Sequence, residues 1–378
     1  VKEGIIKAGG TPMVFSTVAP CDGIAEGHEG MRYILPTRDL VASSVECMVR
    51  AHRFDGLVLL GSCDKIVPGM LMAAARLEMP AIFLNGGPMF PANYHGKHYD
   101  GNIITEAIGW KQQGKIDEAE FKRIENLAEP CPGSCAMLGT ANTMCSLSES
   151  LGLSLPGSST IPAVLAARFA MGVATGEKIV ELVQKGITTK DILTQKAFEN
   201  AIMHLLTMGG STNGILHLQA IYHEAGLGDL PLETFDTFSR KIPQVASIYP
   251  ASPYDMVDYD NYKETEWYRQ ALRTSAPVFI PIHSEKVFGN KPTQIFSIAQ
   301  RIRSKEDNSR VVAVIKVDSD YSGIKSICDK VQLREKGSLF IVDDNKNIVY
   351  QNNKLNKKDI IDAIPLADYD TDGNYTCK

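Results

Sequence analysis

The feature that most constrains the fold is an apolar run, Leu57–Leu60, that is followed at once by a glycine and reactive side chains. The run has the length and composition of a buried β-strand. The alanine-rich stretch Leu71–Leu77 beyond it predicts a helix. Cys63, Asp64 and Lys65 stand between the two. Because α/β folds bind ligands at the carboxyl ends of their strands, this order predicts a site that contains these three residues.

The three residues also have a simpler interpretation. A buried Cys packs as a small hydrophobe, and an Asp–Lys neighbour pair can be a solvated ion pair. The same tripeptide recurs at Cys328–Lys330 within an amphipathic segment, so it is not specific in itself. The wider context has to decide between a site and ordinary packing.

The neighbouring segments predict an α/β fold. The stretch Pro80–Pro88 has the pattern of a second buried strand that ends in a glycine turn, and a helix is predicted over Arg38–Ala51. Two strand–helix units in succession predict a parallel sheet. A further strand is expected over Thr11–Val18, and the more polar segment Lys111–Glu129 predicts an exposed helical excursion.

Length and composition limit the classes of protein. A chain of 378 residues predicts two domains, and 44% hydrophobic with 22% charged residues is typical of a soluble globular protein. A net charge of −5 gives no general attraction to nucleic acid or to anionic membranes. The sequence shows no membrane-spanning run and no signal peptide, so we expect a cytoplasmic protein. Its eight cysteines are widely spread, which favours free thiols or metal ligands.

Three further segments combine glycine with polar side chains. Cys21–Met31 is a glycine-rich loop with groups that can bind a cation or a substrate. Cys131–Met144 enters a helix through small residues, and Gly209–Asn213 opens another helix with hydroxyl groups. Free N–H groups at a helix start favour anionic ligands. Unliganded thiols in the second segment, and an N-capping Ser or Thr in the third, are the alternatives.

Several of these motifs together resemble one family. The run Cys63–Ala73 resembles the signature of the dihydroxy-acid dehydratase and phosphogluconate dehydratase family. Other segments match the family in the same order, over residues 1 to about 258: Asp22–Ile24, Pro80–Pro88, Cys135–Asn142, Pro156–Pro162 and Gly209–Asn213.

The resemblance implies two kinds of cofactor in a domain over residues 1–258. Cys63 and Cys135 match cysteines that bind an iron–sulfur cluster, of the [2Fe–2S] or [4Fe–4S] type. Asp22, Asp64 and Lys65 match magnesium ligands, with Lys65 as a carbamate, which turns a repelled amine into an anionic oxygen ligand. Soft thiolates suit iron and hard oxygens suit Mg²⁺, so neighbouring residues can serve different metals.

The implied reaction removes water from a 2,3-dihydroxy carboxylate and gives a 2-oxo acid, as in branched-chain amino-acid biosynthesis. Cluster iron would accept the leaving hydroxyl as a Lewis acid, while magnesium holds the carboxylate. Sugar-acid dehydration is the alternative substrate class. Ser211 and Thr212 match a segment near the bound acid. The resemblance also implies a homodimer. The other partner that it implies is a small-molecule dihydroxy acid, as substrate.

The match to the family is incomplete. A preceding segment carries a Pro-Cys-Asn motif with a further cluster cysteine in the family, and a second, barrel-like domain carries a magnesium-binding Glu and a Ser base. We find neither in these 378 residues, and the catalytic base stays unassigned. The chain as written is therefore expected to bind the cluster and magnesium weakly or not at all and to have little activity.

The composition changes near residue 259, where Lys, Asn, Asp and Tyr become more frequent. The helix-like Glu266–Leu272 and the strand-like Val311–Asp318 are followed by a helical pattern over Tyr321–Lys330 and a strand within Gly337–Asp344. These resemble a Cache sensor domain of bacterial receptor kinases, which implies a smaller α+β domain over 259–378 with antiparallel strands and a small-ligand pocket. The alternatives are a divergent α+β domain without an assignable role, or two halves that share no function.

Overall fold

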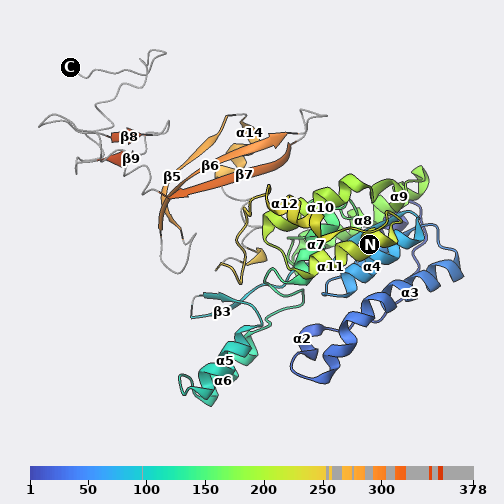
Figure 1. Cartoon of the computed structure of the whole chain (residues 1–378), viewed down its shortest axis with the longest axis horizontal. Helices are drawn as coiled ribbons and strands as arrows, with labels where there is room; N and C mark the ends of the chain where they lie inside the picture. The colour runs from blue at the N-terminus through green and yellow to red at the C-terminus, as the bar shows by residue number, and fades with distance from the viewer. Residues whose placement is uncertain are drawn as a thin grey trace, which may run out of the picture. The chain divides into compact units, whose positions relative to one another are not determined.

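The structure is a computed structural model that describes residues 1–95, 97–252, 255–257, 266–274, 276–285, 293–303, 311–320, 340–342 and 348–351. The chain forms two compact units, Val1–Asn261 and Tyr262–Lys378, which are coloured along the chain in Figure 1. All residues predicted to bind a cofactor, a metal or a substrate lie in the first unit.

The centre of the first unit is a parallel pair of strands joined by a helix. β1 (Leu57–Gly61) pairs in parallel with β2 (Ala81–Asn85), so that Gly61 lies opposite Asn85. α4 (Ile66–Leu77) forms the crossover that a parallel pair requires. The predicted order of strand, turn, helix and strand is confirmed, and the small parallel sheet is consistent with an α/β fold.

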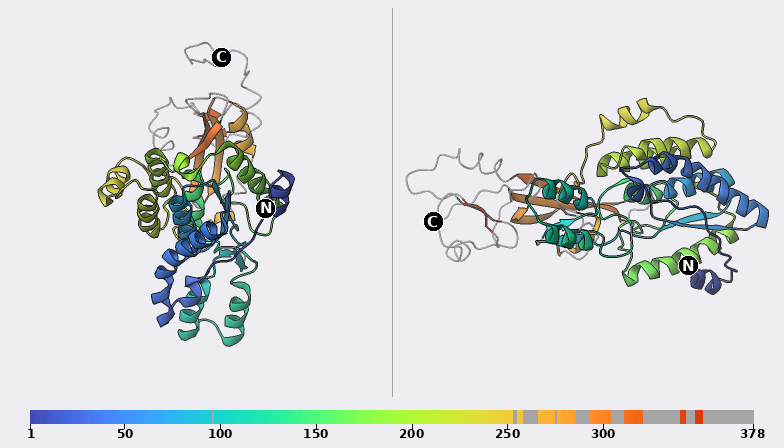
Figure 2. Two further views of the ribbon diagram at one scale, coloured as in Figure 1. Left: turned by 90° about the vertical axis from the view of Figure 1, so that its right-hand side faces the viewer. Right: turned by 90° about the horizontal axis from the view of Figure 1, so that it is seen from below.

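Helices cover both faces of the strand pair (Figure 2). Leu59 and Phe83 belong to the main hydrophobic core, which also contains the buried residues of α4. On the other face, Leu84 lies close to Gly172 of α8 (Ala166–Lys185). Alternate side chains of each strand therefore enter different layers, as the pleat of a strand dictates.

α4 is buried over most of its length, because every residue from Ile66 to Ala75 is shielded from solvent. α3 (Ile34–His52) packs along it. The two helices approach closely at Gly69, where an added Cβ would lie 2.6 Å from the carbonyl oxygen of Arg38. The remaining helices described around this core are α1 (Lys2–Lys7), α2 (Asp22–Ala25), η1 (Glu29–Tyr33, a 3₁₀ helix), α7 (Thr140–Ser150), α9 (Thr189–Ile192), α10 (Gln195–Met208), α11 (Asn213–Glu224) and α12 (Leu232–Ser239).

The predicted helical excursion is a pair of helices, α5 (Ile103–Gln112) and α6 (Glu118–Leu127). They have a small core of their own, centred on Ile103 and Ile124, and Figure 1 shows them projecting from the helices that surround α4. The side chain of Asp117 caps α6 by accepting a hydrogen bond from the N–H of Glu120. A short antiparallel hairpin, β3 (Ala92–Tyr94) with β4 (Lys97–Tyr99), precedes the pair.

The strand expected over Thr11–Val18 is wrong, because the described chain has no strand there. Met13 and Val14 are largely exposed, and β1 pairs with β2 in a two-stranded sheet. An extended, apolar segment forms a strand only when a partner edge accepts its hydrogen bonds, and β-propensity alone does not provide one.

The described part of the second unit is a three-stranded antiparallel sheet with one helix against it. The sheet order is β5 (Val278–Glu285), β6 (Thr293–Arg303) and β7 (Val311–Asp320). α14 (Glu266–Arg273) contributes Ala271 to a small core with residues of β5 and β6. A separate pair joins β8 (Phe340–Val342) to β9 (Ile348–Gln351).

The predicted strand over Val311–Asp318 is confirmed in β7, whereas the helix predicted over Tyr321–Lys330 lies outside the described residues. Among the helices that the structure describes, none has the length and apolar character needed to cross a bilayer.

Candidate functional site

The three reactive residues of the central motif lie where β1 ends and α4 begins. Asp64 and Lys65 are buried and Cys63 is half-buried. The Lys65 Nζ lies 2.8 Å from the Asp64 Oδ1, and both side chains are only about a tenth exposed, at 10% and 11%. The solvated ion pair that served as the simpler interpretation is therefore excluded, since the pair is an interior one. Burying two charges side by side is costly unless they serve a further partner or role.

Asp22 joins this pair from a distant part of the sequence. It is the first residue of α2, and its Oδ1 accepts a weak hydrogen bond from the Cys63 thiol at 3.8 Å. Burial raises the pKa of Asp22 to about 6, and the contact with the Asp64 carboxylate adds to the effect. Burial alone would also raise the pKa of Asp64, but polar contacts with His217, Asp22 and Lys65 outweigh it and hold that pKa well below its usual range.

The two carboxyl groups thus lie side by side with different proton affinities. Near pH 6 Asp22 is about half protonated while Asp64 is ionised. A divalent cation at this position displaces that proton and meets two carboxylates, since metal ligands bind in their deprotonated form.

Sequence reasoning missed His217, which lies on α11 against Asp64. Its side chain is fully buried, and its Nε2 lies 3.8 Å from the Asp64 Oδ1. The Arg38 guanidinium lies 3.3 Å from its Nδ1, and burial lowers the pKa of His217. A guanidinium only donates hydrogen bonds, so Nδ1 accepts and the neutral ring carries its proton on Nε2, toward Asp64. The sequence signal for it is a polar residue within the apolar stretch Ile215–Leu218.

Cysteine side chains gather at the same place. The Sγ atoms of Cys21 and Cys63 and a carboxylate oxygen of Asp22 all lie within 4.8 Å of one another. Burial raises the pKa of Cys63 to about 11, so this side chain is a neutral thiol until a metal displaces its proton. Sequence reasoning assigned Asp22 but not Cys21, although the two are adjacent.

The predicted Cys135 lies in the loop before α7 and is not one of that group of three. Cys135 is exposed at its surface, but partial desolvation of its sulfur raises the pKa of Cys135 to about 12; Asp100 and Glu129 add to the effect, followed by Cys63 and Cys21. Cys135 therefore shares the electrostatic environment of the other two thiols.

The donor set fits both implied cofactors. In the part of the chain that the structure describes, the Asp64 Oδ1 and the His217 Nε2 are buried without a hydrogen-bond partner, apart from the ion pair with Lys65. Buried polar atoms in native proteins normally have partners, so the His217 Nε2 in particular is consistent with a further group that binds here. The set contains both thiols and carboxylates, which match the preferences of iron and of magnesium respectively.

Asn85 is a second residue that sequence reasoning missed. It ends β2 opposite Gly61, at the same edge of the sheet as Cys63, and its side chain is fully buried. Neither its Nδ2 nor its Oδ1 has a hydrogen-bond partner among the described residues. Its position adds an amide to the polar groups at the carboxyl end of the parallel pair.

Ser211 and Thr212 lie at the start of α11. The Ser211 Oγ lies 2.9 Å from the Thr140 Oγ1, and the Ser211 N–H donates to the Thr143 Oγ1 at 3.0 Å. These bonds join the start of α11 to the start of α7. Thr212 is exposed and occupies the N-cap position, but its side chain makes no capping hydrogen bond. Simple capping therefore does not explain Thr212.

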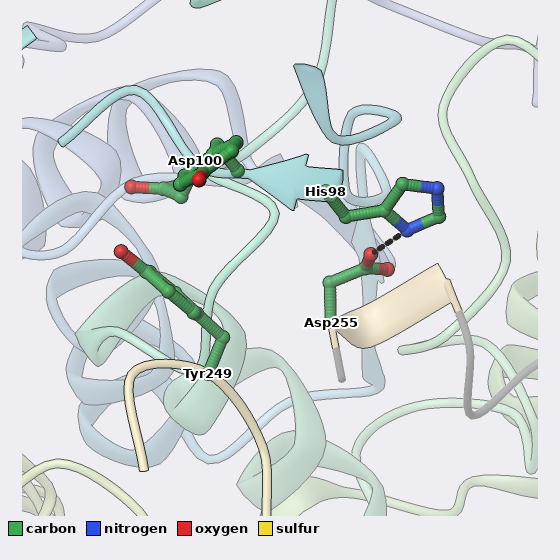
Figure 3. A pocket seen from close by; sticks show the side chains of 5 residues that line it. His98, Asp100, Tyr249 and Asp255 are labelled. Carbon is green, nitrogen blue, oxygen red and sulfur yellow. Dashed lines mark hydrogen bonds and ion pairs between the residues drawn. The ribbon is translucent and has the colours of Figure 1, made fainter. Parts of the chain in front are cut away.

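A second polar group lies beside β4 and is drawn in Figure 3. The His98 Nδ1 lies 2.9 Å from the Asp255 Oδ2, and Figure 3 shows the imidazole turned onto that carboxylate. Asp100 accepts hydrogen bonds from the N–H groups of Asn102 and Met137. Both carboxylates are therefore used in holding the hairpin and the Cys135 loop, and the recess between them encloses little space.

Comparison with known proteins agrees with this geometry. Residues 1–262 match the family described as dihydroxy-acid/6-phosphogluconate dehydratase N-terminal. A dihydroxy-acid dehydratase of Halothermothrix orenii is 54% identical over 258 residues, which is 68% of this chain and 47% of the relative. A dihydroxy-acid dehydratase of Ignicoccus hospitalis is 52% identical over 261 residues, 69% of this chain and 47% of the relative.

The relatives clarify the extent of the match. A dihydroxy-acid dehydratase of Pyrococcus abyssi is 51% identical over 258 residues, again 47% of its length. The chain thus spans about half the length of the curated relatives that it matches. It belongs to the dihydroxy-acid/6-phosphogluconate dehydratase family, through its residues 1–262.

Proposed function

We propose that residues 1–262 form the cofactor-binding part of a hydro-lyase that removes water from a 2,3-dihydroxy carboxylate and gives a 2-oxo acid. The observation that carries the proposal is the gathering of Cys63, Asp22 and Asp64 at the carboxyl end of β1, with a buried Asp64 oxygen that is paired with the Lys65 ammonium. Among the relatives, the proteins named dihydroxy-acid dehydratase favour this substrate class. A sugar acid is the alternative.

In this proposal Cys63 and Cys135 hold an iron–sulfur cluster, and Asp22, Asp64 and carbamylated Lys65 hold Mg²⁺. When bound, the two metal centres supply Lewis-acid stabilisation of the departing hydroxyl and of the substrate carboxylate. Ser211 and Thr212 lie near the acid. Branched-chain amino-acid biosynthesis is the corresponding pathway.

The protein's own groups prepare the magnesium ligands. His217 directs its Nε2–H at Asp64, and Arg38 fixes the tautomer that does so. In the unmodified chain the Lys65 ammonium lies 2.8 Å from the Asp64 Oδ1. A cation there competes with a metal ion, whereas a carbamate at the same position contributes oxygen ligands.

Anaerobic reconstitution tests the proposal. Iron, sulfide and magnesium contents are measured and a visible spectrum is recorded for the wild-type chain, Cys63→Ser and Cys47→Ser. Cys47 is an exposed cysteine on α3, so its replacement serves as the control. Iron and sulfide bound equally by the wild type and by Cys47→Ser, even at less than one cluster per chain, with loss in Cys63→Ser, supports the proposal. Absence of iron from every variant contradicts it. Turnover of dihydroxyisovalerate compared with that of a sugar acid then separates the two substrate classes.

For residues 259–378 we propose a small-ligand sensor domain of the Cache type as a second function. An antiparallel sheet with α14 packed on it supports an α+β unit. In a thermal-shift assay of the whole chain, amino acids and small carboxylates should raise the melting temperature of this unit and leave that of residues 1–262 unchanged. No ligand-dependent shift across such a panel would count against a sensor.

A further inference from the structure

Cys21 is a thiol at the candidate site that has no role in the function proposed above. It stands directly before α2 in an extended conformation, with φ −98° and ψ 125°. Its Sγ lies within 4.8 Å of the Sγ of Cys63 and of a carboxylate oxygen of Asp22. Among the residues that the structure describes, this is the one group of three potential ligand side chains so close together.

The chain brings these thiols together from separate elements. Cys63 follows β1, whereas Cys21 ends the extended segment before α2. Cys21 is exposed to solvent. The sulfur is therefore held beside Cys63 and remains accessible to a ligand.

A third thiol belongs to the same environment. Both Cys63 and Cys21 contribute to the raised pKa of Cys135, which follows from their proximity to it. Cysteines from the residue before α2, the segment after β1 and the loop before α7 thus act on one another electrostatically.

Two buried atoms beside this group are poorly satisfied. Within the described residues, the His217 Nε2 is buried and makes no hydrogen bond, and the buried Asp64 Oδ1 has the Lys65 ammonium, at 2.8 Å, as its close partner. Asp64 is adjacent to Cys63 and in contact with Asp22. These atoms indicate independently of the thiols that a further group belongs at this place.

We propose that Cys21 is a thiolate ligand of the iron–sulfur centre, together with Cys63 and Cys135. The assignment rests on the proposed function, which places a cluster at the latter two. Thiolates are the ligands that iron–sulfur centres take from proteins. The Cys21 and Cys63 sulfurs lie within 4.8 Å of each other, so both would be available to one iron–sulfur centre.

The test compares Cys21→Ser with the wild type, Cys63→Ser and Cys47→Ser after anaerobic reconstitution. Cys47 is the matched control, since it is an exposed cysteine like Cys21 but lies on α3 outside the thiol group. Cys21→Ser is expected to shift the visible thiolate-to-iron bands and to release iron to a chelator at least about tenfold more readily. Cys47→Ser is expected to match the wild type.

Titration of the cluster-free, reduced chain with Co²⁺ provides a second measurement. The intensity of the thiolate-to-cobalt band per bound ion should fall in Cys21→Ser and in Cys63→Ser, and stay unchanged in Cys47→Ser. Far-ultraviolet circular dichroism confirms that each variant is folded.

Three outcomes overturn the assignment. If Cys21→Ser equals the wild type in iron content, spectrum and cobalt band while Cys63→Ser loses iron, Cys21 is not a ligand and the proposed function stands. A Cys21–Cys63 disulfide that persists in the reduced, iron-loaded chain also overturns it. If the wild-type chain binds no iron at all, the proposed function fails with it.

Discussion

The Nε2 of His217 lies 3.8 Å from the Oδ1 of Asp64, in an interior where the His217 side chain is fully buried. This distance is too long for a hydrogen bond, yet the ring tautomer set by Arg38 aims an N–H at that oxygen. His217 and Asp64 are thus oriented as donor and acceptor, and a small movement on cation binding would bring them within hydrogen-bond distance. Partners of this kind orient metal ligands in known metal sites.

Replacement of His217 should therefore affect magnesium more than the cluster. His217→Leu removes the N–H directed at Asp64 and is expected to weaken Mg²⁺ binding about tenfold. His217→Gln keeps a donor and should retain most of the affinity. Calorimetric titration of Mg²⁺ into both variants makes the comparison, with the visible spectrum as the control for the cluster. Equal Mg²⁺ affinity in the two variants would show that the N–H does not act on Asp64.

Lys65→Arg should abolish Mg²⁺ binding, because a guanidinium cannot be carbamylated and keeps a positive charge beside Asp64. In the wild type, added bicarbonate should strengthen Mg²⁺ binding, since it supplies carbon dioxide for the carbamate. The measurement is Mg²⁺ affinity with and without bicarbonate. Unchanged binding in Lys65→Arg would exclude a ligand role for this residue.

Arg76 joins three helices and should matter for stability. Its guanidinium donates to Glu224 on α11 at 2.6 and 2.8 Å and to Glu46 on α3 at 2.9 Å, and its side chain is 27% exposed. Arg76→Ala removes the Arg76 partner of Glu224 and leaves Glu46 with Arg50 alone, at a partly buried position, and is expected to lower the free energy of unfolding by about 2 kcal/mol.

Arg50→Ala is the matched control, because Arg50 pairs with the same Glu46 but is 62% exposed. Its loss should cost less than about 1 kcal/mol. Urea denaturation of both variants gives the two values. If both variants lose the same free energy of unfolding, the pairing with Glu46, and not the burial of Arg76, determines how much Arg76 stabilises the fold.

The same cluster predicts a pH dependence. Hydrogen bonds from Arg50 and Arg76 lower the pKa of Glu46 from its usual value of 4.5. A lowered carboxyl pKa stabilises the fold above the unfolded-state value, and that stabilisation is lost as the pH falls through the folded-state value. The stability difference between the wild type and Glu46→Gln should therefore be largest near neutral pH and shrink below pH 4.5. A difference that grows on acidification would contradict the sign of the shift.

The elements around the central motif could be predicted from sequence because their signals are local. An apolar run, a glycine and an apolar helix pattern define β1 and α4, and the following run defines β2. The error at Thr11–Val18 has the opposite origin, since strand formation depends on a partner edge that no local pattern specifies.

The site could be predicted only where residues stand together in a motif. Cys63, Asp64 and Lys65 are consecutive, so one segment contains all three. His217 and Arg38 reach Asp64 from α11 and α3, and Cys21 reaches Cys63 across a long stretch of chain. Such pairings arise from tertiary packing, and the isolated His or Cys is more often a buried structural residue.

Because α4 is completely buried from Ile66 to Ala75, the position of the reactive segment before it depends on the packing of the interior. A helix without a solvent-facing side cannot slide or tilt to accommodate an altered neighbour, because close-packed interiors transmit displacement. Substitutions deep in the core, such as at Val41 against Gly69, should then reach Cys63–Lys65 as small shifts of position. The same helix therefore has to satisfy both dense packing and the position of the reactive residues. The affinity for a bound metal would respond to small changes in the packing of the core.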